Sequence, residues 1–250
     1  MSGHSKWASI KHKKAVTDAR RGQLFTKLAR AITVAAREGG GDPEANYTLA
    51  AAIEKARGYS MPKESIQRAI DRGTGAGGAG AEIERVIYEG YGPGGAAIMV
   101  EALTDNRNRT SADVRHVFDK QGGSLGEPGS VAWVFDKRGV ILLDAGRYSE
   151  DDLIVAIDAG ADDVSVDGDV LKVTTPPSAL GAVREALSSA GVEPSSVEVS
   201  MEPKSVVKVG GGEANRLLRL VEALDELDDV ESVTANFDIP DEVLEEAAAA

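Results

Sequence analysis

The order of strand-like and helical segments between residues 139 and 204 is the feature that most limits how this chain can fold. The pattern predicts strands over 139–143, 163–166, 170–174 and 196–201 and helices over 150–159 and 179–190. In chain order this is β-α-β-β-α-β, the order of the ferredoxin-like fold. Residues 138–204 are therefore expected to form a self-contained ferredoxin-like domain.

The segments on either side of this domain are each too small to bury a core. The segment before it is predicted to contain strands over 85–91, 96–103 and 130–136, a turn at 92–95 and a helix over 110–120. The segment after it is predicted to contain a helix over 214–227 and a strand over 231–238. Together they can close one domain. We expect a discontinuous α/β domain of residues 82–137 plus 205–240, with 138–204 inserted in it, followed by a tail over 241–250.

Residues 1–72 are expected to form a separate helical domain. Leu24, Leu28, Ile32 and Ala35 recur at helical spacing, and glycines 39–41 end that helix. Asp42-Pro43 predicts the start of a second helix, and Pro62 that of a third. The fold class is thus α+β and multi-domain: a helical N-terminal domain and two α+β domains, one ferredoxin-like and inserted in the other.

The Gly-rich stretch over 73–81 is predicted to be a linker. It contains the spacing of a dinucleotide-binding loop at Gly73, Gly75 and Gly78. That loop, however, follows a strand and opens a helix, whereas this one follows a predicted helix and precedes a strand. A flexible connection is the better interpretation, and no cofactor is expected.

The charge distribution carries the main functional signal. The chain has a net charge of −13, but residues 1–72 hold fourteen Lys and Arg against seven Asp and Glu, so they carry +7 and the remainder carries −20. A polyanion is attracted to the first part and repelled by the rest. The predicted partner is therefore nucleic acid, contacted through the N-terminal domain.

The N-terminal basic segment, residues 6–37, and His4 just before it supply the candidate contacts. Its cationic side chains can neutralise phosphates, Trp7 offers a face for stacking, and nearby Gly and Ser allow backbone N–H groups to approach a phosphate. On the predicted helix, three of its cations lie opposite the apolar stripe. The candidate residues are His4, Lys6, Trp7, Lys11, His12, Lys13, Lys14, Arg20, Arg21, Lys27, Arg30 and Arg37.

A second candidate patch lies where a predicted strand joins a helix, over 104–110. Arg107 and Arg109 there, with the N–H groups of a helix N-terminus, could hold an anion. The alternative is that Asp105 and Asn108 are turn and cap residues while both arginines pair with local acids. The Gly-rich loop over 121–130 fits either a mobile contact loop or a connector.

No pattern of catalytic or metal-binding residues stands out. The chain has no Cys and three His, two of them among the N-terminal lysines, and its acidic clusters fall at helix ends or on predicted helix surfaces. No apolar run reaches the length of a membrane span, and the basic N-terminus lacks the apolar stretch of a signal peptide. We expect a cytoplasmic protein that is not an enzyme and has no metal, membrane partner or small-molecule substrate.

Several longer motifs are recognisable along the chain. They are the opening MSGHSKWASIKHKKAVTDARRGQLFTKLARAI, then YEGYGPGG at 88–95, LTDNRNRTSADVRH at 103–116, GSVAWVFDKRGVI at 129–141 and ALDELDDVESVTANFDI at 223–239. Over nearly the whole chain, these motifs resemble the YebC/PmpR family of transcriptional regulators. The resemblance implies the same three-domain arrangement and a cytoplasmic DNA-binding transcriptional regulator. Some relatives, including the mitochondrial translational activator of cytochrome c oxidase, act in translation on the ribosome.

Two functional hypotheses follow. In the first, the protein is a DNA-binding transcriptional regulator, although no recognition helix or dimer element is evident in the sequence. In the second, it is a ribosome-associated translation factor whose basic domain docks on rRNA or tRNA phosphates, which suits recognition by shape. The residues alone favour the second slightly, and the family's usual description favours the first.

Overall fold

A computed structural model describes residues 18–76, 83–240 and 243 of the chain. Most of the predicted linker and C-terminal tail, and the first seventeen residues, lie outside that range. The described residues form two compact units: residues 18–132 with 209–235, and residues 133–208 with 236–240. Each unit is described by itself below, and the helical and α/β elements share the first one.

Three helices begin the first unit: α2 (Asp18–Gly39), α3 (Tyr47–Gly58) and α4 (Lys63–Gly73). The predicted apolar stripe of α2 is confirmed, because Leu28, Ile32 and Ala35 are buried against the other two helices. At the far end of α4, a Cβ on Gly73 would lie 2.3 Å from the Thr33 carbonyl oxygen of α2. Gly73 therefore belongs to a helix-helix contact, and not to a phosphate-binding loop.

The predicted start of α3 is wrong by one turn. Asp42 and Pro43 lie in a turn in which the Asp42 carbonyl accepts from the Asn46 amide at 2.9 Å. The N-cap is Asn46, whose side-chain oxygen accepts from the Leu49 amide at 3.1 Å. Its amide nitrogen also donates to the carbonyl oxygens of Ala35 and Gly40, each at 2.8 Å. Asn46 is buried, so one side chain both caps α3 and ties it to the end of α2.

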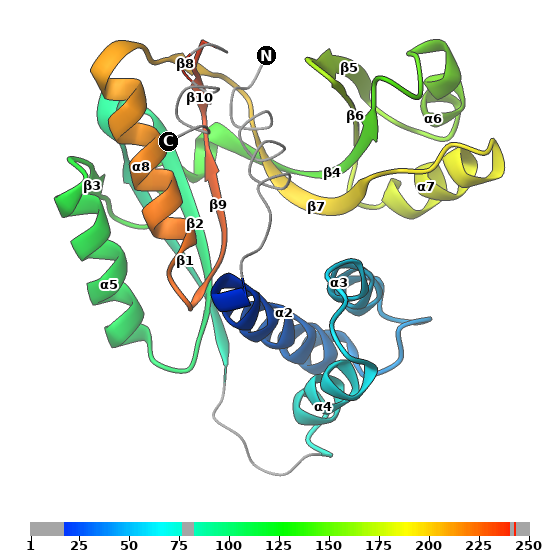
Figure 1. Ribbon diagram of the computed structural model, residues 1–250, viewed down its shortest axis with the longest axis horizontal. Coiled ribbons are helices and arrows are strands. Elements are labelled where there is room, and N and C mark those ends of the chain that lie inside the picture. The colour runs from blue at the N-terminus through cyan, green and yellow to red at the C-terminus, as the bar shows by residue number, and fades with distance from the viewer. Residues whose placement is uncertain (1–17, 77–82, 241–242, 244–250) are drawn as a thin grey trace. The chain divides into compact units, whose positions relative to one another are not determined.

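A four-stranded antiparallel sheet, in the order β3-β1-β2-β9, completes this unit. Its strands are β1 (Glu84–Tyr91), β2 (Ala97–Thr104), β3 (Ser124–Leu125) and β9 (Val230–Ala235). The two helices α5 (Arg107–Lys120) and α8 (Gly211–Asp225) cover one face of the sheet (Figure 1). The predicted hairpin between β1 and β2 is confirmed, and its turn η1 (Pro93–Gly95) places Gly94 at φ 75°, which favours glycine.

The second unit contains the ferredoxin-like sheet that the segment order predicts. Its strands β4 (Phe135–Asp144), β5 (Asp163–Asp167), β6 (Val170–Thr175) and β7 (Ser196–Pro203) lie in the order β5-β6-β4-β7, and all neighbours are antiparallel. A 3-10 turn η3 (Asp151–Leu153) leads into α6 (Ile154–Asp158), which packs with α7 (Leu180–Ser189) over one core (Figure 1). The predicted fold class, α+β with a ferredoxin-like domain, is confirmed.

Two predicted strands differ from the structure. The strand expected over 130–136 is a loop up to Ala132, because the Glu89 carboxylate binds backbone N–H groups there; a 3-10 turn η2 (Ala132–Val134) then leads into β4. The strand expected over 231–238 ends at Ala235 with β9. Phe237–Asp238 form β10, which pairs in parallel with β8 (Val207–Lys208) in a separate two-stranded sheet.

Candidate nucleic-acid interface

Much of the predicted basic segment lies outside the described residues. His4, Lys6, Trp7, Lys11, His12, Lys13 and Lys14 fall there, while Arg20 and Arg21 lie on the first turn of α2, whose side chains are described from Gly22 onward. Residues 1–21 hold six of the fourteen Lys and Arg of the first 72 residues but only one of the seven acids. Residues 22–72 hold the other eight cations but also six acids, so they carry only +2 of the net +7.

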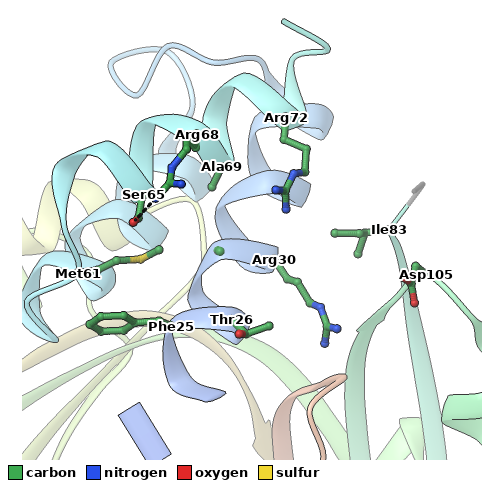
Figure 2. A pocket seen from close by; sticks show the side chains of 11 residues that line it. Phe25, Thr26, Arg30, Met61, Ser65, Arg68, Ala69, Arg72, Ile83 and Asp105 are labelled. Carbon is green, nitrogen blue, oxygen red and sulfur yellow. Dashed lines mark hydrogen bonds between the residues drawn. The ribbon is translucent and has the colours of Figure 1, made fainter. Parts of the chain in front are cut away.

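A groove runs along the first unit between α2 and α4. It has a volume of about 620 Å³. Its lining is Phe25, Thr26, Ala29, Arg30, Met61, Ser65, Arg68, Ala69, Arg72, Ile83 and Asp105. Figure 2 shows the three arginine side chains, two from α4 and one from α2, beside apolar side chains of both helices. Three cations and one acid thus share this groove.

Arg68 and Arg72 were not among the residues predicted from the sequence. They lie one helical turn apart on α4, and both are exposed. One signal in the sequence could have identified them, namely the helical spacing that places them on the same face as Ser65 and Ala69. The sequence alone does not show that this face lies beside α2.

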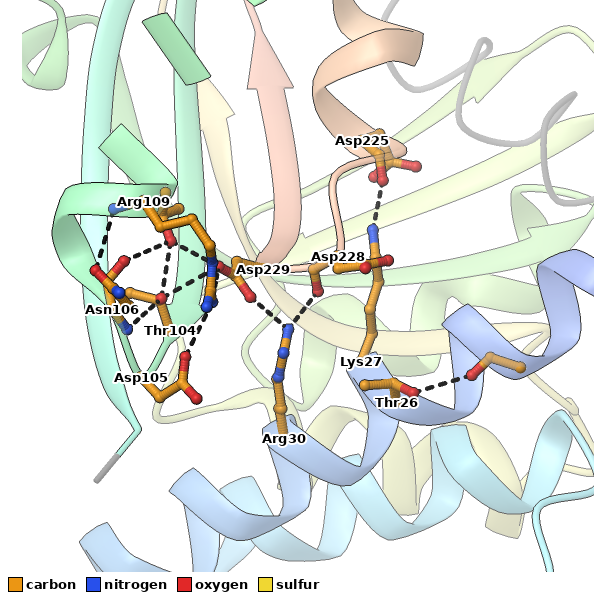
Figure 3. A network of polar contacts seen from close by, with 12 residues as sticks. Thr26, Lys27, Arg30, Thr104, Asp105, Asn106, Arg109, Asp225, Asp228 and Asp229 are labelled. Atoms are coloured by element: carbon orange, nitrogen blue, oxygen red, sulfur yellow. Dashed lines mark hydrogen bonds and ion pairs between the residues drawn. The ribbon is translucent and has the colours of Figure 1, made fainter. Parts of the chain in front are cut away.

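Arg30, at the edge of the groove, is bound to an acid far away in the chain. Its Nη1 atom lies 2.7 Å from Asp229 Oδ1 and 2.6 Å from the Asp228 carbonyl oxygen (Figure 3). The Lys27 ammonium donates to the Asp225 carbonyl oxygen, and Arg37 Nη1 donates to the Ile83 carbonyl oxygen at 2.8 Å. The cationic face of α2 therefore makes contacts within the unit.

Asp229 is the centre of this network and is 7% exposed. Its Oδ2 atom accepts from Thr110 Oγ1 at 2.6 Å, Arg109 Nη2 at 2.7 Å and Thr104 Oγ1 at 3.2 Å. Burial alone would raise the pKa of Asp229, but the hydrogen bonds from Thr110 and Arg109 and the charge of Arg30 outweigh it, and the pKa is lowered. The carboxylate is thus held ionised between two arginines from different elements.

In the second candidate patch, residues 104–110, both arginines pair with acids, which is the alternative interpretation given above. Arg109 Nη2 also lies 2.9 Å from Asp105 Oδ1, and the pKa of Arg109 is raised by its hydrogen bonds to Asp229 and Asp105. Arg107 Nε lies 3.6 Å from Glu84 Oε1. The helix cap is Asn106 rather than Asn108, since its side chain accepts from the Arg109 amide at 3.1 Å.

The predicted loop over 121–130 contains the short strand β3 and is fixed by a buried carboxylate. Glu89 accepts from the amides of Gly129 and Val131 at 2.7 Å and of Ala132 at 2.8 Å. Burial acts to raise the pKa of Glu89, but these three backbone hydrogen bonds outweigh it and lower the pKa. The end of the loop is therefore held as a connector to β4.

Within residues 18–76 and 83–240, no group of three or more His, Asp or Glu side chains is placed to hold a metal ion. In the same part of the chain, no helix has both the length and the apolar composition needed to cross a bilayer.

Comparison with known proteins agrees with the motifs. The model of the TACO1/YebC protein N-terminal domain matches residues 5–76, and that of the TACO1/YebC second and third domain matches residues 83–237. The chain belongs to the TACO1/YebC family.

Relatives in this family match nearly the whole length of the chain. A "probable transcriptional regulatory protein" of Rubrobacter xylanophilus is 56% identical and covers 99% of this chain and 100% of its own length. A protein of the same name from Dictyoglomus turgidum is 50% identical and covers 98% of this chain and 99% of its own length. The crystal structure of a conserved hypothetical protein from Aquifex aeolicus superposes with a TM-score of 0.87, at 48% identity, covering 96% of this chain and 99% of that one. The TACO1/YebC fold therefore extends through the chain.

Proposed function

We propose that this protein is a cytoplasmic, nucleic-acid-binding regulator of transcription that acts by binding rather than by catalysis. The carrying observation is the concentration of positive charge in residues 1–72 of a chain that is otherwise strongly acidic. Full-length relatives named as probable transcriptional regulatory proteins support the assignment. The acidic remainder would repel nucleic acid, so binding is expected to be confined to the N-terminal domain.

Contacts to phosphate are expected mainly from the N-terminal lysines. Arg30 and Arg109 share Asp229, so each would have to give up an ion pair before meeting a phosphate. Arg107 is more available, since its side chain is 64% exposed and lies 3.6 Å from its acidic partner. We rank Lys11, Lys13 and Lys14 first among the proposed contacts.

The test is a salt titration of binding to duplex DNA by the full-length protein. Replacing Lys11, Lys13 and Lys14 with Ala should weaken binding and lower the slope of log K against log salt by up to about three, because each lost phosphate contact removes about one released counterion. A matched triple variant replaces the exposed lysines 120, 137 and 208. It makes the same change in charge outside the N-terminal domain, and its slope should stay at the wild-type value.

An unchanged slope in the N-terminal variant would contradict the proposed contacts. The link to transcription has its own measurement: DNA cross-linked to the protein in cells should be enriched in promoter sequences. Enrichment of RNA without DNA would contradict the transcriptional assignment while leaving nucleic-acid binding intact.

A further inference from the structure

We propose that the groove between α2 and α4 binds a short single-stranded segment of nucleic acid. In this arrangement Arg68 and Arg72 contact consecutive phosphates, and an unpaired base lies on the apolar floor. The inference rests on the proposed function and adds to it a specific site, whose two α4 arginines were not among the residues predicted from the sequence.

The two arginines of α4 are available to a ligand. Among the described residues, Arg68 donates only to neutral oxygens of its own helix, the Glu64 carbonyl at 3.2 Å and Ser65 Oγ at 3.0 Å. Arg72 has no ion pair with any residue in the described part of the chain. The acid that lines the groove, Asp105, lies 2.9 Å from Arg109, which offsets its charge. The groove therefore presents uncompensated positive charge.

The floor of the groove suits an unpaired base. Its apolar surface comes from Phe25, Ala29, Met61 and Ala69. The groove volume of about 620 Å³ lies within the range of about 300–1,000 Å³ typical of small-molecule sites. Aromatic and apolar side chains receive unpaired bases with little preference for sequence. One wall thus offers charge to the backbone and the floor offers apolar contact to a base.

The groove exists before any ligand arrives. Thr33 of α2, which is fully buried, donates through Oγ1 to the Ala69 carbonyl of α4 at 3.1 Å. At the end of α4, Gly73 allows the close contact with α2 described above. Because these contacts fix the spacing of the two helices, little ordering entropy is lost when a ligand binds.

A single strand fits this site better than a duplex. Side chains one helical turn apart have Cβ atoms about 5–6 Å apart, so two arginines can follow adjacent phosphates of one strand. A duplex keeps its bases stacked and paired inside, so it offers no base to a groove floor, whereas single strands have bases that can leave the stack.

The test compares two double variants of the full-length protein, each two positive charges poorer than wild type. Arg68→Ala with Arg72→Ala removes the groove cations, and Arg115→Ala with Arg219→Ala removes two exposed arginines of α5 and α8. Binding to a labelled 15-nucleotide single strand, as DNA and as RNA, and to the matching duplex is followed over a salt series. The groove variant should lower the single-strand slope by about 1.4, from about 0.7 per phosphate contact, and the control should not.

A second measurement locates the base. A single strand carrying 4-thiouracil, cross-linked by light, should attach to the peptides that contain Phe25 or Met61. If wild type binds no oligonucleotide, the proposed function fails and this inference fails with it. If wild type binds but the two double variants behave alike, or if only duplex binding changes, the groove assignment is overturned and the proposed function stands.

Discussion

Replacing Asp229 with Asn tests whether one buried carboxylate holds the helices and the sheet of the first unit together. The substitution keeps the shape of the side chain and one acceptor oxygen, so the hydroxyls of Thr104 and Thr110 can still be satisfied. It removes the negative charge that lies 2.7 Å from Arg30 and 2.7 Å from Arg109.

The expected cost follows from the exposure of the two arginines. The Arg30 side chain is 22% exposed, so losing its charged partner should cost about 1.5–3 kcal/mol. The Arg109 side chain is 47% exposed and is well hydrated without Asp229, so most of the cost comes from Arg30. We expect a loss of about 2–3 kcal/mol, or a fall in Tm of about 4–10 °C for a unit of this size.

Thermal unfolding and hydrogen exchange provide the assay. Exchange should quicken in α2 and in the turn over 225–229, where the Leu103 amide donates to the Asp229 carbonyl at 2.8 Å. Asp228→Asn is the control, because Asp228 is an exposed neighbour and the change in charge is identical. If both variants unfold within about 1 °C of each other at neutral pH, the network does not hold the two parts together.

The pH dependence supplies an independent check with a definite sign. The pKa of Asp229 is lowered on folding, so its contribution is present above the ordinary value near 3.9 and is lost as the pH falls through the folded value. The difference in stability between wild type and the Asn variant should therefore be constant near neutrality and shrink below about pH 4. A constant difference down to pH 2 would contradict the assignment.

Two further carboxylates should respond in opposite directions. Glu89→Gln removes a charged acceptor of three backbone N–H groups and should lower the free energy of unfolding by about 2 kcal/mol at neutral pH. Because the pKa of Glu89 is lowered, this difference between wild type and variant should shrink in acid. Urea unfolding of both proteins from pH 7 to 3 measures it. Burial raises the pKa of Glu231, although Arg85 lies 3.2 Å away, so wild-type stability should fall as pH rises through that raised pKa. Glu231→Gln should remove this dependence and leave stability at pH 7 equal or higher; a large loss would contradict it.

Periodicity was sufficient for the longer elements but not for the short ones. Helix α2 and the ferredoxin-like order have repeated apolar positions, which patterns detect. The strands β3, β8 and β10 have two residues each and show no period. Glu89 illustrates the same limit: its sequence neighbours form an ordinary strand, while its carboxylate organises a loop some forty residues later.

The candidate site shows why charge alone misleads. From the sequence, Arg30 is a cation in a basic segment and Arg109 a cation at a helix start, and both suit a phosphate. Their partner is Asp229, which is 199 and 120 positions away and belongs to the acidic part of the chain. The packing of α2 against β9 brings Arg30 to Asp229, and the pairing of β2 with β9 brings Arg109 to it.

This pairing changes how the charge asymmetry should be interpreted. Part of the acidic remainder already neutralises part of the basic domain, so the +7 of residues 1–72 overstates what a polyanion meets on the described helices. Residues 22–72 hold eight cations against six acids, while residues 1–21 hold six against one. Long-range attraction should therefore come from the first 21 residues, and the described helices should contribute the local geometry of Arg68 and Arg72. Removing the N-terminal charge should slow association and make the association rate less dependent on salt, whereas removing the two groove arginines should mainly speed dissociation of single strands.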